Sequence, residues 1–261
     1  MNKECLRRAF MIVSYLALQI LRILALAGRI GHGGSELLAR QSEHLLTPYP
    51  LALALTLSVD VLFFLYIFYS LGLITPHKSE FARRFVEIAD IGLLLTSLFS
   101  IARLLAWHNE VFALALLFDL AILIFTLRVS MGYQGDPTRP FWPRFPFDYL
   151  LGTILCLSVS DFGHLLCFWS GGRPPFEPQA FALVLLLLAA LLCLIAGLKQ
   201  LAPGSFVMPL LSFAALAYTH LSVKGFDGRF PAVYITAIVC MPIMLAAMIV
   251  AMIQRRRVFW R

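Results

Sequence analysis

The stretch AFALVLLLLAALLCLIAGL, residues 180–198, decides the fold class because it runs through nineteen residues without a single charge. A helix rises about 1.5 Å per residue, so about 20 apolar residues cross a hydrocarbon layer about 30 Å thick. Seven further runs of similar length and character cover residues 10–28, 50–73, 86–107, 111–127, 147–169, 205–221 and 231–253. The sequence therefore predicts an all-α, polytopic integral membrane helix bundle of about eight transmembrane helices.

The composition agrees with a chain that is dissolved in lipid. Apolar residues make up 61% of the chain and charged residues 13%, and the mean hydropathy is +0.86. Ordinary soluble domains are about 45–50% apolar and about 25% charged. The net charge of +7 would suggest nucleic acid in a soluble protein, but cationic loops facing anionic lipid headgroups explain it here. The lipid bilayer is the expected partner, together with other membrane subunits or a second copy, and nucleic acid is not.

The basic residues are distributed unevenly between the two ends of the expected spans. With eight spans, fourteen of the 21 Lys and Arg residues fall on the side that holds both termini, and five fall on the other. Arg22 and Arg103 lie within spans. Short cationic loops stay on the cytoplasmic side, so both termini are expected to be cytoplasmic. The plasma membrane and the endoplasmic reticulum are the expected locations.

The first run also has the form of a signal peptide. Residues 1–8 are basic, residues 9–18 are apolar, and Ala-Leu-Ala at 25–27 resembles a cleavage site. Cleavage of residues 1–27 would leave seven spans and a receptor-like layout. Against this alternative, Gln19 and Arg22 interrupt the apolar core where it should lead into the cleavage region.

No segment between the runs is long enough to fold by itself. We therefore expect residues 1–261 to form a single membrane-embedded domain, with two four-helix halves at 1–132 and 147–261. A proline-rich cytoplasmic loop, residues 133–146, would join the halves. Its prolines exclude a helix, and it would act either as a rigid connector or as a docking ribbon for a cytoplasmic partner.

Six ionisable residues at bilayer depth are the main functional indication. Such residues are costly and usually face the bundle interior, where they pair or line a polar path. Counted from the outer span ends at about 1.5 Å per residue, three acids lie about 12–15 Å deep, and two arginines and a histidine lie about 6–9 Å deep. This candidate polar layer consists of Asp60, Asp119, Asp161, His164, Arg22 and Arg103.

Depth alone allows each of the two arginines to pair with an acid. Arg22 can reach Asp60, and Arg103 can reach either Asp119 or Asp161. The pairs could simply fix helix packing. They could also form a polar site that binds a proton, a cation or a small polar substrate. Asp161 is then the best candidate for proton coupling, because His164 lies one turn away and titrates near neutrality.

The remaining patterns limit the function without identifying it. Glu87 and Asp90 are expected to open the third span, where acids suit the helix dipole. A retinal protein needs a lysine in the middle of a span, and none lies there. Neither the histidines nor the five cysteines have metal-ligand spacing, so no cofactor or metal is expected. The sequence favours a non-enzymatic carrier or membrane-organising subunit with a transport role. The alternative is a lipid or isoprenoid enzyme that acts through a membrane carboxylate, with no catalytic residue assigned.

Overall fold

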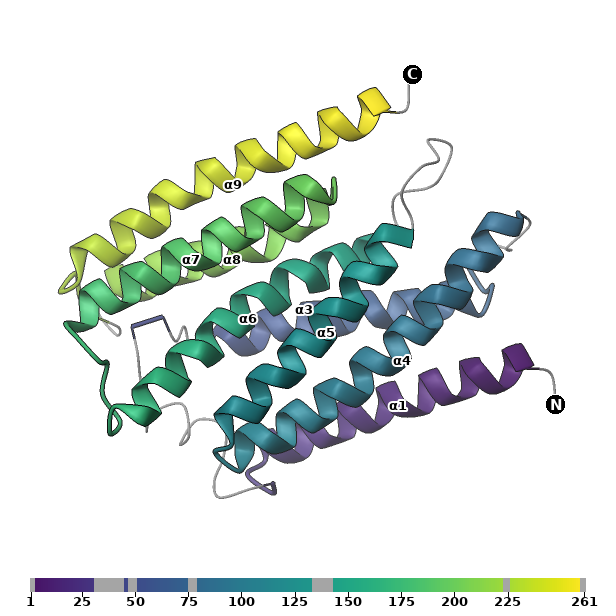
Figure 1. Cartoon of the computed structure of the whole chain (residues 1–261), viewed down its shortest axis with the longest axis horizontal. Coiled ribbons are helices and arrows are strands. Elements are labelled where there is room, and N and C mark those ends of the chain that lie inside the picture. Colours follow the sequence, from purple (N-terminus) through teal and green to yellow (C-terminus); the bar gives the residue numbers. More distant parts are fainter. Residues whose placement is uncertain are drawn as a thin grey trace. The chain divides into compact units, whose positions relative to one another are not determined.

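A computed structural model describes residues 3–30, 45–46, 51–74, 79–132, 143–222 and 226–258, with the backbone alone at 51–56 and 256–258. In these ranges every regular element is a helix, which confirms the predicted all-α fold class (Figure 1). The elements are α1 (Lys3–Leu26), α3 (Leu51–Ser70), α4 (Glu80–His108), α5 (Phe112–Gly132), α6 (Phe145–Trp169), α7 (Pro178–Lys199), the 3-10 helix η1 (Pro203–Phe206), α8 (Val207–Leu221) and α9 (Pro231–Val258).

Seven of the eight apolar runs overlap one helix each, and the run at 205–221 overlaps η1 and α8. Within the described residues, seven helices are long and apolar enough to cross a membrane, with η1 and α8 counted together as Pro203–Leu221. The eighth is α3, of which Leu57–Ser70 qualifies as a shorter apolar helix. A multi-span helical membrane fold therefore stands. The number of eight spans and the cytoplasmic location of both termini stay predictions.

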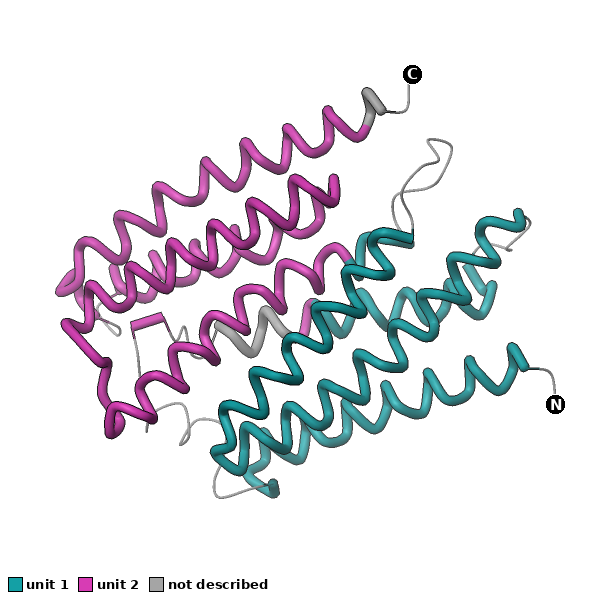
Figure 2. Tube along the Cα trace, in the orientation of Figure 1, with its two compact units in different colours: residues 1–38, 59–147 teal, residues 39–58, 148–261 magenta. Residues whose placement is uncertain are grey.

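The chain divides into two compact units (Figure 2). Unit 1 comprises Met1–Leu38 and Val59–Phe147, and unit 2 comprises Ala39–Ser58 and Asp148–Arg261. The division into halves at 1–132 and 147–261 stays a prediction. Residues 133–142, most of the proline-rich loop, lie outside the described residues, and so does the choice between a connector and a docking ribbon.

The helix α4 begins six residues before the expected span start at residue 86. Ser79 caps it in an extended conformation, and its hydroxyl accepts a hydrogen bond from the amide of Ala82 at 3.1 Å. Arg84 and Glu80, one turn apart, form an ion pair with an N–O distance of 2.5 Å. This pair stabilises the first turn of α4, which precedes the expected span. The charged segment before the apolar run is therefore helical, which moves Asp90 well into the helix.

In unit 1, α1 packs along α4, and α4 packs along α5. The helices α1 and α4 run in the same direction and α5 runs back, as Figure 1 shows. The buried side chains of α1 include Met11, Tyr15, Leu18 and Ala25, whose spacing of three, four and seven residues defines one face. The opposite face carries exposed apolar side chains such as Val13, as expected for contact with lipid.

In unit 2, α7 and α8 both pack against α9, and η1 contacts all three. Two glycines allow η1 to approach the neighbouring helices closely. A Cβ at Gly197 of α7 would overlap the ring of Phe206, and a Cβ at Gly152 of α6 would overlap the carbonyl oxygen of Ser205. The backbone of η1 therefore lies where a side chain on α6 would otherwise be, and the ring of Phe206 lies where a side chain on α7 would be.

Candidate functional site

The first predicted pair lies between α1 and α3 in unit 1. The guanidinium of Arg22 forms an ion pair with the carboxylate of Asp60. Gln19 donates a hydrogen bond to the same carboxylate at 3.0 Å, and the hydroxyl of Tyr15 donates to the backbone carbonyl of Asp60 at 2.7 Å. Three residues on one face of α1 thus converge on one residue of α3. The side chains of Arg22 and Asp60 stay 30% and 15% exposed.

The second pair joins α4 to α5 within the same unit. The Nε of Arg103 lies 2.5 Å from Oδ1 of Asp119, whose side chain is fully buried. Depth along the helices allowed either Asp119 or Asp161 as the partner of Arg103, and in the structure Arg103 pairs with Asp119. A buried carboxylate beside a guanidinium is electrically compensated, which suits a contact that holds two helices together.

The last two members of the predicted layer lie on α6 in unit 2. Asp161 and His164 are each only 3% exposed. They are three residues apart, so their side chains lie on one face of the helix. A carboxyl group and an imidazole are therefore close to each other within a candidate membrane span.

A third buried acid cluster in unit 1 was not expected to be a site. Asp90 of α4 is fully buried, and its Oδ1 accepts hydrogen bonds from the hydroxyls of Tyr66 at 3.0 Å and Ser70 at 2.6 Å. Its Oδ2 lies 3.5 Å from Nε of Arg7 and 3.8 Å from Nε of Arg8. One carboxylate therefore connects α1, α3 and α4.

The sequence contained a signal for this cluster in the segment before Asp90. Ser79 followed by Glu80 has the form of a helix start, and it makes Asp90 the eleventh residue of α4. At about 1.5 Å per residue, this position lies about 15 Å from the helix start, which is not the first turn. With the span expected to start at residue 86, Asp90 falls near the helix start and its depth is underestimated.

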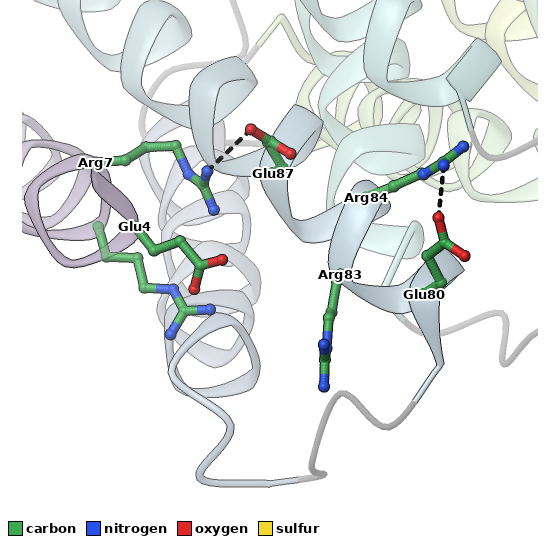
Figure 3. A pocket seen from close by; sticks show the side chains of 7 residues that line it. Glu4, Arg7, Glu80, Arg83, Arg84 and Glu87 are labelled. Atoms are coloured by element: carbon green, nitrogen blue, oxygen red, sulfur yellow. Dashed lines mark hydrogen bonds and ion pairs between the residues drawn. The ribbon is translucent and has the colours of Figure 1, made fainter. Parts of the chain in front are cut away.

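Next to the Asp90 cluster, with which it shares Arg7 and Arg8, the N-terminal ends of α1 and α4 line a mixed-charge hollow of about 530 Å³ (Figure 3). Arg7 pairs with Glu87 across it at 3.3 Å, and Arg84 pairs with Glu80 at its rim. We refer to it as the Arg/Glu hollow. Its lining residues are Glu4, Arg7, Arg8, Glu80, Arg83, Arg84 and Glu87.

A comparison with known protein families agrees with this multi-span helical architecture. The family described as TSPO-like protein matches residues 8–250, almost the whole chain. The chain belongs to this family. No curated protein and no solved structure matches it. The TSPO-like protein is accordingly an integral, multi-pass protein of a lipid bilayer.

Two further histidines of the TSPO-like protein are buried, and each lies at the C-terminal end of a helix. His108 ends α4, and its Nδ1 lies 2.9 Å from the carbonyl oxygen of Leu104. His220 of α8 places Nε2 2.9 Å from the carbonyl oxygen of Leu45, and its ring stacks on Phe226. Among the described residues, no group of three His, Cys, Asp or Glu side chains is arranged to hold a metal ion.

The pair formed by Arg22 and Asp60 can be tested by a double-mutant cycle. Removing either partner strands a charge, whereas removing both does not, so Arg22→Leu and Asp60→Leu should be coupled by about 1–3 kcal/mol. The measurement is unfolding of the TSPO-like protein in mixed micelles. The exposed pair of Arg84 and Glu80 is the control, with an expected coupling below about 0.5 kcal/mol. Additive losses at the first pair would show that the two side chains do not stabilise each other.

Proposed function

We propose that this TSPO-like protein is a carrier that takes a proton, a cation or a small polar substrate through the membrane. The observation that carries the proposal is the couple of Asp161 and His164, buried on one face of α6. Ionisable side chains are costly at this depth and commonly mark ion pathways and proton relays. An imidazole changes its charge near neutral pH, so it can exchange a proton with a neighbouring carboxyl during a transport cycle.

The charges of unit 1 support a non-enzymatic role. Asp60, Asp90 and Asp119 each lie against at least one arginine from another helix. A general acid must carry a proton and present it to its substrate, and a carboxylate held by a guanidinium is poorly suited to that task. These pairs favour fixed helix packing in unit 1 over the intramembrane lipid enzyme.

A second candidate function is that of a membrane-organising subunit. The incomplete burial of Arg22 and Asp60 favours it, because an ion pair at bilayer depth is stabilised when another protein covers it. Both proposed functions assume that residues 1–27 are not cleaved as a signal peptide. It is supported by the packing of α1 on α4 and by the ion pairs that Arg7 and Arg22 make with other helices.

Proteoliposomes distinguish these functions. With a pH-sensitive dye inside and an imposed membrane potential, the carrier should move protons faster than protein-free liposomes do. Lipid composition should stay unchanged over the same period. A changed lipid pool without flux would indicate the enzyme. No flux together with a stable complex of several chains would favour the organising subunit.

A further inference from the structure

The Arg/Glu hollow carries an inference that does not depend on the carrier proposal. It lies where the apolar parts of α1 and α4 begin, since Arg8 is followed by the apolar run of α1 and Arg84 is followed by Phe85 and Val86, each 1% exposed. Its volume of about 530 Å³ falls within the range of small-molecule sites. A ligand here would sit at the boundary between water and hydrocarbon.

We propose that this hollow binds the headgroup of a phospholipid that carries both a phosphate and a primary ammonium. Its lining offers four guanidinium groups and three carboxylates. A guanidinium matches phosphate oxygens with two parallel hydrogen bonds, and a carboxylate accepts the N–H groups of an ammonium. A lining with both signs of charge suits a ligand with both signs better than a simple anion.

The lining can open at the cost of one weak ion pair. Glu80 and Arg84 are 78% and 74% exposed, so their mutual contact is weak and their side chains can turn toward a ligand. Arg84 would then engage the phosphate and Glu80 the ammonium, which replaces one internal pair by two. Arg7 is held by its ion pair with the buried carboxylate of Asp90 and keeps its place as a fixed part of the wall.

The surface next to the hollow favours a lipid over free phosphate as the source of this chemistry. Along α4, Ile88 and Ile91 follow Arg84 and Glu87 at spacings of four residues, on the same face, and are 38% and 43% exposed. Along α1, Phe10 follows Arg7 and is 57% exposed. These side chains can contact acyl chains while the headgroup occupies the hollow.

The test measures retention of labelled lipids by the purified full chain in detergent. The probes are phosphatidylethanolamine, phosphatidylcholine and phosphatidylglycerol. We expect about tenfold stronger retention of phosphatidylethanolamine, the value of one charge-assisted hydrogen bond. The choline headgroup has no N–H to donate, and the glycerol headgroup has no amine. Equal retention of the three lipids would overturn the proposal.

Two variants and a control localise the effect. Arg84→Gln should weaken retention of all three lipids about tenfold, and Glu80→Gln should remove only the preference for phosphatidylethanolamine. Arg173→Gln, which removes an exposed arginine far along the chain in unit 2, should change neither. An equal loss with Arg173→Gln would mean nonspecific charge attraction. Full displacement of the lipid by inorganic phosphate would mean a free-phosphate site, and either result would overturn the proposal. Unchanged melting temperatures confirm that the variants fold.

Discussion

Replacing Asp90 with leucine is expected to lower the free energy of unfolding by about 3–5 kcal/mol, the usual cost of removing one partner from a buried ion cluster. The carboxylate is fully buried and balances Arg7 and Arg8. Its removal would also leave the hydroxyls of Tyr66 and Ser70 without their acceptor. Unfolding in mixed micelles, followed by circular dichroism, measures the loss.

Glu87 provides the matched control for Asp90. It lies on the same helix and pairs with the same Arg7 at 3.3 Å, but its side chain is 60% exposed. Glu87→Leu should therefore cost less than about 1 kcal/mol, as exposed ion pairs do. Equal losses for the two variants would show that the connection between α1, α3 and α4 does not depend on the buried carboxylate.

Asp161→Asn is expected to abolish transport at normal protein abundance. The amide keeps the shape of the side chain but can neither bind nor release a proton. If the carboxyl serves only packing, the variant should instead be tolerated, and any loss of activity should follow protein level alone. Proton flux in proteoliposomes, normalised to the reconstituted protein, separates the two outcomes.

The control for this variant is Asp227→Asn, which removes the same charge from an exposed position of unit 2. Asp227 has a φ of 49°, a conformation that asparagine adopts readily, so no strain is added. Its flux should equal that of the unchanged protein. Normal flux in Asp161→Asn would end the proton-coupling hypothesis and leave Asp161 as a packing residue.

The helices could be predicted from sequence because the bilayer imposes one strong rule, an apolar run of about 20 residues. Their ends were less predictable. Polar helix ends carry no apolar signal, so α4 was placed six residues short and α5 was expected to end at residue 127, although it continues to Gly132. At the start of α4, the cap by Ser79 and the ion pair of Glu80 with Arg84 stabilise the additional turn.

The buried charges were only partly predictable. Depth along a helix follows from counting residues, so Asp60 could be matched to Arg22. The rotation of each helix about its own axis does not follow from counting residues, so either Asp119 or Asp161 could be the partner of Arg103. Arg144 shows the same limit: it was counted with the cytoplasmic loop, yet it is 2% exposed and donates a hydrogen bond to Ser130 at 2.9 Å. Only the packed helices reveal such a contact.

The ion pair between α1 and α3 constrains how the protein is made. A ribosome completes α1 before α3, so Arg22 leaves the exit tunnel before Asp60 does. A lone arginine is costly in hydrocarbon, and the cost falls once its partner arrives. The first helix is therefore expected to wait at the insertion machinery and to enter the lipid together with α3. The carboxylate of Asp60 would then set the time at which the N-terminal part of the chain becomes anchored.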